Sequence, residues 1–430
     1  MAPQKRADNW IDGLRGVAAL TVVTYHLCSC FANWLNSPAI SENGSVYLFQ
    51  YPFLRLVVAG RLAVALFFII TGYVNSFNSR KQIRNGDFTF ALSRLARTVL
   101  MVWFVCQLNG FQIASQVDSG WIRGSGTPTP GPTFCNAING LLRNLILFWH
   151  NGVSEYDHTY WTIPFFLKGS MLVYVTLLGT TYTQPKYTKL ILIFLYLFAW
   201  SGGQALMEMN IYAGMFLAEL NADYRTNASS LISWPLSTLM MLFGLFLASF
   251  PDENPSWMPW SRAVDAVGQS LIPNGGELNR HVVSLGTTIF VFGVFFSSHA
   301  RRLLAHPFMN FIGRISFPIY LLHNTLIRTV LSWVLYRQSI PNDDPPTYTP
   351  TGHWKADLLA AILNVISAAT DLSIRIFDYL KIQTDVAKLS DDKKRFEEQR
   401  QQAGTSDADP DDLRATIDAL ETDWDGPLRP

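Results

Sequence analysis

Long uncharged, mostly apolar stretches recur along the chain and are separated by short polar segments. The stretches are 63–79, 98–117, 169–185, 190–207, 226–251 and 281–300. Several of them reach or approach the roughly 20 residues that a helix needs to cross a bilayer. Because lipid offers no partner to backbone amides, repeated spans of this kind predict helices.

We therefore predict an all-α, polytopic bundle of about ten transmembrane spans. Their expected limits are 14–35, 52–77, 89–110, 160–182, 188–203, 205–221, 231–250, 282–299, 310–336 and 355–378. The fifth, sixth and tenth have the weakest patterns, and the tenth is interrupted by Asp371 and Arg375. Residues 1–380 would form the membrane domain. In residues 381–430 acidic side chains outnumber basic ones, which predicts a polar and largely disordered tail.

Composition agrees with a membrane protein. Charged residues make up 15% of the chain, against about 25% in a typical soluble domain. The net charge of +1 gives no indication of nucleic-acid binding. The first eleven residues lack the pattern of a cleavable signal peptide, so we expect the first span to be retained.

Basic residues predict the orientation, because Lys and Arg concentrate in cytosolic loops. They precede the first span and cluster after the second, for example at Arg94 and Arg97, whereas residues 36–51 contain none. Both termini are therefore predicted to be cytosolic, and the long loops 111–159 and 251–281 to lie on the outer side. Asn43, in an Asn-Gly-Ser triplet of an outer loop, is then a possible glycosylation acceptor.

The first apolar segment contains Arg15 and His26, and from Gly16 to Ser41 His26 is the only side chain that can be charged near neutral pH. Eleven helical steps place Arg15 and His26 on nearly one face, roughly 16 Å apart along the axis. A cation near one membrane surface and a base about half-way in would suit a long ligand with an anionic head and a reactive end. The alternative is an anchoring arginine and a hydrogen-bonded interior histidine.

Four motifs in order resemble the acyltransferase-3 family of polytopic membrane acyltransferases. They are residues 12–16 followed by His26, the Phe-rich segment 65–73, the basic segment 94–97 and the late segment 312–323, which ends in His323. The resemblance covers roughly residues 10–380. It implies transfer of an acyl group, often acetyl, from acyl-coenzyme A to a hydroxyl. It also implies an essential role for His26 with Arg15.

One position departs from that family. Residues 161–170 resemble its Trp–Ser/Thr motif, in which a glutamate usually lies five residues after the tryptophan; here that residue is Phe166. Another polar group, such as Glu155, Asp157 or His158, would have to replace the carboxylate, or the chemistry is weakened.

Other residues have two interpretations each. His323 could line the donor or acceptor path or serve helix packing. Arg94 and Arg97 could contact coenzyme A phosphates or only set the topology, and Trp161 could bind substrate or anchor its helix at the membrane surface. The four cysteines show no metal-ligand spacing, so we expect no metal and no bound cofactor beyond acyl-CoA as co-substrate.

The resemblance thus implies an acyl-CoA-dependent O-acyltransferase, with a hydroxylated small metabolite or a carbohydrate as acceptor. The style of the sequence resembles the fungal branch of the family, in which such enzymes decorate secondary metabolites. Two alternatives stay open: a degenerate member that binds acyl-CoA without turnover, and a transporter, although no inverted repeat is visible.

Overall fold

Helices account for every regular element in the part of the chain that the structure describes, which confirms the predicted all-helical class. The structure is a computed structural model. It describes residues 9–333, except for residues 86, 117–120, 123–127, 153, 203–204, 225–226 and 273–275. The predicted tenth span, the boundary at residue 380 and the predicted tail lie outside the described residues.

The helices follow one another closely along the chain. The α-helices are α1 (Asn9–Phe31), α2 (Gly60–Asn85), α3 (Asp87–Gln107), α4 (Gln112–Gln116), α6 (Phe134–Asn151), α7 (Thr162–Thr180), α8 (Pro185–Ser201), α9 (Asn210–Tyr224), α10 (Ala228–Leu231), α11 (Trp234–Ala248), α12 (Pro259–Leu271), α13 (Leu278–Phe296), α14 (Ser298–Leu304) and α15 (Pro307–Leu326). The 3-10 helices are η1 (Asn33–Asn36), η2 (Leu48–Gln50), η3 (Leu54–Val58), η4 (His158–Trp161) and η7 (Pro255–Trp257). The π-helical segments are η5 (Ala205–Met209) and η8 (Ile327–Leu331).

Four helices among the described residues are long and apolar enough to cross a membrane. Their apolar stretches are Trp10–Phe31, Gly60–Phe77, His158–Thr180 and Leu278–Phe296. Shorter apolar helices cover Leu95–Gln107 and Trp234–Ala248. These elements coincide with the first, second, fourth and eighth predicted spans and with the third and seventh. The full count of ten stays a prediction.

The second predicted span, 52–77, begins later than expected. Its helix, α2, starts at Gly60, and the 3-10 helices η2 and η3 precede it. Phe53 lies between them with a φ of 67°, a left-handed conformation that a regular helix does not contain. Its backbone N–H donates to the Ser249 hydroxyl at 3.0 Å, so a contact with the end of α11 holds this turn in place.

The segment 111–159 is folded where the sequence predicted a long loop. It contains α6, whose N-terminus is capped by the Thr133 side chain and whose C-terminus ends at Gly152 with a φ of 70°. Trp103 of α3 donates a hydrogen bond to the Ala137 carbonyl at 3.0 Å, which joins α6 to α3. The loop expectation was wrong because α6 is amphipathic and carries polar residues along one side.

The second predicted loop, 251–281, is also partly helical. It contains α12, which begins at Pro259, a residue that suits the first turn of a helix. Ser261 is buried in that turn and donates to the Pro255 carbonyl at 2.7 Å. Its hydroxyl therefore joins α12 to η7.

Three helix pairs make the most extensive contacts: α1 with α15, α2 with α9 and α11 with α13. Each pair meets where a glycine lets two backbones touch. A Cβ on Gly313 of α15 would lie 1.9 Å from the carbonyl oxygen of Asp12 in α1. A Cβ on Gly214 of α9 would lie 2.0 Å from a carbonyl oxygen of α2, and one on Gly244 of α11 would lie 2.4 Å from a backbone nitrogen of α13. Small residues allow such close packing between membrane helices.

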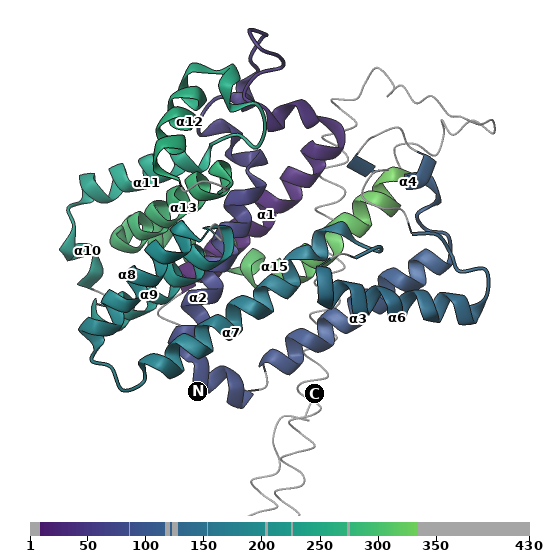
Figure 1. The fold of residues 1–430 in the computed structure, drawn as a ribbon, viewed down its shortest axis with the longest axis horizontal. Helices are drawn as coiled ribbons and strands as arrows, with labels where there is room; N and C mark the ends of the chain where they lie inside the picture. The colour runs from purple at the N-terminus through teal and green to yellow at the C-terminus, as the bar shows by residue number, and fades with distance from the viewer. Residues whose placement is uncertain are drawn as a thin grey trace, which may run out of the picture. The chain divides into compact units, whose positions relative to one another are not determined.

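Helix α2 connects these pairs, because it also contacts α1, α7 and α13. Figure 1 shows α1 and α15, from opposite ends of the described chain, lying beside each other, and α3 lying beside α6. The α1–α15 contact brings the two sequence motifs that end in histidine into one place.

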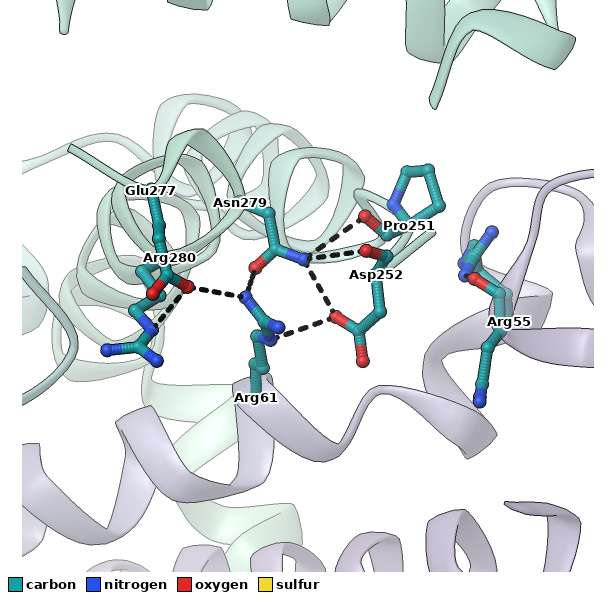
Figure 2. Close-up of polar contacts among 8 residues, drawn as sticks. Arg55, Arg61, Pro251, Asp252, Glu277, Asn279 and Arg280 are labelled. Atoms are coloured by element: carbon teal, nitrogen blue, oxygen red, sulfur yellow. Dashed lines mark hydrogen bonds and ion pairs between the residues drawn. The ribbon is translucent and has the colours of Figure 1, made fainter. Parts of the chain in front are cut away.

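A polar network ties the start of α2 to the loop after α11 and to the start of α13 (Figure 2). Arg61 pairs with Asp252, with Nε 3.2 Å from Oδ1, and also donates to Asn279. Asn279 in turn donates to Asp252 at 3.0 Å. Glu277 lies 3.8 Å from Arg61 and 2.7 Å from Arg280. Because these side chains are partly exposed, the network orients the helix ends more than it stabilises them.

Candidate active site

His26 lies in the C-terminal third of α1 and contacts two rings from distant segments. α1 runs without a break from Asn9 to Phe31, so Arg15 and His26 do lie along one helix. The His26 ring centroid is 5.1 Å from that of His323 and 4.9 Å from that of Trp121. The side chain is half-buried, and its Nδ1 atom is buried without a hydrogen-bond partner among the described residues.

His323 is fully buried on α15 and forms the other half of this histidine pair. Its Nδ1 lies 2.7 Å from the Tyr320 carbonyl oxygen and 3.2 Å from that of Ile319. Since a carbonyl can only accept, Nδ1 carries the proton and donates. In the neutral ring Nε2 is then an acceptor, and it is buried without a partner among the described residues. The backbone of α15 therefore fixes the tautomer of His323.

A fully buried carboxylate, Asp157, lies beside the pair. Its Oδ1 accepts from Asn324 Nδ2 at 2.7 Å and from the backbone and hydroxyl of Thr159 at 2.8 and 2.7 Å. Its Oδ2 accepts from the Thr325 hydroxyl at 3.2 Å. Asn324 and Thr325 directly follow His323, with which the carboxylate interacts electrostatically. All these partners donate hydrogen bonds, as an ionised carboxylate requires.

Two tyrosines join α15 to the start of α7. Tyr320 Oη donates to the Thr159 carbonyl at 2.8 Å and lies 2.5 Å from the Thr162 hydroxyl. Tyr160 Oη donates to the Leu321 carbonyl at 3.1 Å. All these groups are buried. They fix the histidine-bearing turn of α15 against the segment that carries the carboxylate.

Arg328 is a residue of this site that sequence analysis missed. It is fully buried in η8, and its guanidinium lies 5.0 Å from the centre of the Phe111 ring. Its Nη1 donates to the Tyr156 carbonyl at 3.4 Å, and its charge interacts with that of Asp157. An arginine inside the ninth predicted span, 310–336, was the available signal. π-Helical segments are themselves frequent at functional sites.

The remaining residues predicted for the site lie elsewhere on α1, α3 and η4. Arg15, near the start of α1, pairs with Asp12 at 3.3 Å. Arg97 is exposed on α3, and Arg94 lies on the same helix, where its side chain is not described. Trp161 is exposed at the end of η4. The structure thus brings together the two histidines, whereas the arginines and the tryptophan occupy other positions.

Phe166 fills the place where the family resemblance expects a glutamate. It packs against two phenylalanines of α2, at centroid distances of 4.9 and 6.2 Å. Of the three replacements considered, Glu155 and His158 are exposed, whereas Asp157 is buried beside the histidine pair. Asp157 is therefore the carboxylate that the structure offers to the site.

A cavity of about 290 Å³ opens next to the segment that carries Asp157. It is lined by Gln107, Pro128, Thr129, Gly131, Asn136, Ala137, Gly140, Glu155 and Tyr156. Burial raises the pKa of Tyr156 to about 12, so the hydroxyl stays protonated and can donate. The lining presents hydroxyl, amide and carboxylate groups, and none of these lining residues is a cation.

Comparison with known proteins agrees with this picture. An acyltransferase domain model of the acyltransferase-3 family matches residues 8–367. The O-acetyltransferase PaAT-1 of Phomopsis amygdali is 24% identical over 384 residues, 75% of this chain and 73% of that protein. The acyltransferase clz18 of Cochliobolus lunatus is 24% identical over 411 residues, 77% of this chain and 86% of that protein.

The acyltransferase R4 of a Phoma species is 22% identical over 389 residues, 74% of this chain and 82% of that protein. No solved structure matches the chain. The family match spans the segments that carry His26, Asp157 and His323. From this match and from its apolar helices, we conclude that the chain is a membrane protein and belongs to the acyltransferase-3 family.

Proposed function

We propose that the protein moves an acyl group, acetyl being the first to test, from acyl-CoA to a hydroxyl of a small metabolite. A fungal secondary metabolite or a carbohydrate is the class of acceptor that we expect. The observation that carries the proposal is the pair of His26 and His323 together with the buried Asp157, which interacts electrostatically with His323. Ionisable groups inside a membrane helix bundle are costly and mark functional sites.

In this proposal His26 is the general base. A hydroxyl is a weak nucleophile until a neighbouring base takes its proton, and histidine titrates near neutrality. As His26 accepts that proton, the acceptor oxygen attacks the thioester carbonyl carbon and a tetrahedral intermediate forms. Its collapse breaks the carbon–sulfur bond, and the proton on His26 passes to the departing thiolate. The products are an ester and free coenzyme A.

Arg15 is proposed to bind the donor. It lies eleven residues before His26 on one continuous helix, which corresponds to roughly 16 Å along the axis. A guanidinium binds phosphate through paired hydrogen bonds. A donor whose phosphates lie near Arg15 would extend its thioester along α1 toward His26. Arg94 and Arg97 on α3 would add positive charge for the same phosphates.

The cavity beside Tyr156 is proposed to hold the acceptor. Its hydroxyl and amide groups suit a hydroxylated molecule, and its carboxylate, Glu155, would repel the phosphates of coenzyme A. Tyr156 directly precedes Asp157, so the cavity wall continues into the segment that contacts the histidine-bearing turn. This arrangement supports separate entry of donor and acceptor.

The proposal is tested with membranes that carry the native protein, His26→Ala or His299→Ala at matched expression. His299 is exposed on α14 and serves as the control histidine. Each sample receives acetyl-CoA labelled in the acetyl group and a metabolite extract from the source organism. We expect a labelled, extractable product from the native and His299→Ala membranes, and none from His26→Ala.

Three results would contradict the proposal. Equal product from the native and His26→Ala membranes would remove His26 from the mechanism. In a second result, the native protein binds acyl-CoA and yet transfers no acyl group, whichever acceptor or longer acyl donor is supplied. That result would favour a degenerate family member that only binds acyl-CoA. Ligand flux in proteoliposomes without acyl-CoA would favour the transporter.

A further inference from the structure

Two buried ring nitrogens without partners lie on neighbouring rings, Nδ1 of His26 and Nε2 of His323. An unsatisfied buried polar atom costs about 1–3 kcal/mol. The ring centroids are 5.1 Å apart and the ring planes differ by 32°. No hydrogen bond joins the two atoms as the rings stand, so pairing them requires the His26 ring to rotate and turn Nδ1 toward Nε2 of His323. Because both atoms are buried and lie on neighbouring rings, a hydrogen bond between them would satisfy both at once.

We propose that His323 positions the base by accepting a hydrogen bond from Nδ1–H of His26, which leaves the lone pair of His26 on Nε2. The catalytic role of this hydrogen bond rests on the proposed function, whereas the existence of the hydrogen bond does not depend on it. His323 is in this sense a positioning residue, and His26 is the residue that meets the acceptor hydroxyl.

The direction of this hydrogen bond follows from the backbone. Nδ1 of His323 donates to the carbonyls of Tyr320 and Ile319, so its Nε2 can only accept while the ring is neutral. His26 must therefore supply the proton from Nδ1. With Nδ1 of His26 donating to His323, Nε2 keeps its lone pair and is the nitrogen left to take the proton of the acceptor hydroxyl.

The charges around the pair fit this role. When His26 takes the acceptor proton, the pair becomes a cation, and the buried carboxylate of Asp157 interacts with it through His323. Asp157 accepts four hydrogen bonds from Thr159, Asn324 and Thr325, so it is held as a fixed negative charge. The cation Arg328 faces the same carboxylate from η8, and His158 interacts with His26 from η4.

The kinetic test compares His323→Phe, His323→Gln and His281→Phe in the purified protein. Phe keeps a ring but accepts no hydrogen bond, whereas the Gln side-chain oxygen can take the place of Nε2. His281 is a buried histidine of α13 outside the pair, and its replacement reports the cost of losing a buried imidazole. We expect kcat to fall about 10²–10³-fold in His323→Phe with KM for acyl-CoA unchanged. His323→Gln should retain at least about tenfold more activity than His323→Phe, and His281→Phe should retain native kcat.

A spectroscopic test does not depend on activity. Ring ¹⁵N chemical shifts of histidine-labelled protein distinguish protonated from unprotonated nitrogens, and His26→Gln identifies the His26 signals by their loss. We expect His26 to carry its proton on Nδ1 in the native protein and to lose this preference in His323→Phe. His281→Phe should leave the tautomer of His26 unchanged.

A native His26 with its proton on Nε2 would overturn the inference, and so would a tautomer and kcat that are both unchanged in His323→Phe. If the tautomer is as expected but the native protein transfers no acyl group, the proposed function fails and the hydrogen bond between the histidines stands. The two failures are therefore distinguishable.

Discussion

At the scale of single residues, the carboxylate of the site combines two tasks. Asp157 caps η4 by accepting the backbone N–H of Thr159, a common role for aspartate before a helical turn. The same oxygen accepts from Asn324 of α15. A residue suited to a cap therefore also supplies negative charge beside His323. This leaves Phe166 free to pack between α7 and α2.

Phe166→Glu tests whether the site still needs a glutamate at the family position. The new carboxylate would lie among phenylalanine rings, so we expect Tm to fall in line with a loss of about 2–3 kcal/mol. The rate of acyl transfer should not increase, because Asp157 already supplies a carboxylate beside His323. Thermal unfolding in detergent and product formation per folded protein measure both effects, with Phe166→Leu as the control. A Phe166→Glu protein that is faster than the native protein would refute this assignment.

The sequence identified His26, His323 and Asp157 as candidates, but it missed Arg328 and could not give the contacts among these residues. Helical spacing put His26 on a defined face of α1, and the late motif singled out His323. Their contact depends on how two distant helices pack, which no local pattern encodes. Similarly, the sequence could not separate Asp157 from Glu155 and His158, because the burial of Asp157 depends on its contacts with α15.

At the scale of helices, the contact between α1 and α15 sets the separation of the two histidines. Gly313 of α15 lies against the Asp12 carbonyl, and Gly16 of α1 lies against the backbone of α15. The apolar pattern was enough to predict both helices, although α15 contains Arg314. The amphipathic helices α6 and α12 were missed because a search for uncharged runs passes over a helix with one polar face.

Gly313→Ala tests this contact. The added methyl group would overlap the Asp12 carbonyl, so α1 and α15 must separate at a cost of about 1–3 kcal/mol. We expect a lower Tm and slower acyl transfer, since His323 would move away from His26.

Gly179→Ala in α7 is the matched control, because a Cβ there meets nothing within 4 Å. Removing an exposed helical glycine should leave activity unchanged and stabilise by up to about 1 kcal/mol. Equal Tm and activity in the two variants would show that the α1–α15 contact does not position the histidines.

At the scale of the whole molecule, the proposed orientation with cytosolic termini places α6 and the Asn43 loop on the outer side of the membrane. Asn43 is exposed in a turn with a φ of 64°, so its side chain is open to glycosylation if the orientation is right. The side of the membrane on which α6 lies can be measured through Cys135 at its start. Cys135 is a free, exposed cysteine, whereas Cys30 and Cys106 are buried.

We expect Cys135 to be shielded from a membrane-impermeant maleimide in sealed microsomes and to be labelled only after detergent is added. Cys135→Ser should abolish that labelling and so show which thiol reacts. Ser230→Cys in the Cys135→Ser background is the matched control, because Ser230 is exposed and lies in a segment predicted to be cytosolic. It should be labelled without detergent. The reverse labelling pattern would show that the orientation of the protein in the membrane is opposite to the proposed one. Labelling of both positions without detergent would show that α6 and α10 lie on the same side of the membrane. That second result would require an even number of crossings between Cys135 and Ser230, whereas the predicted fourth, fifth and sixth spans make three.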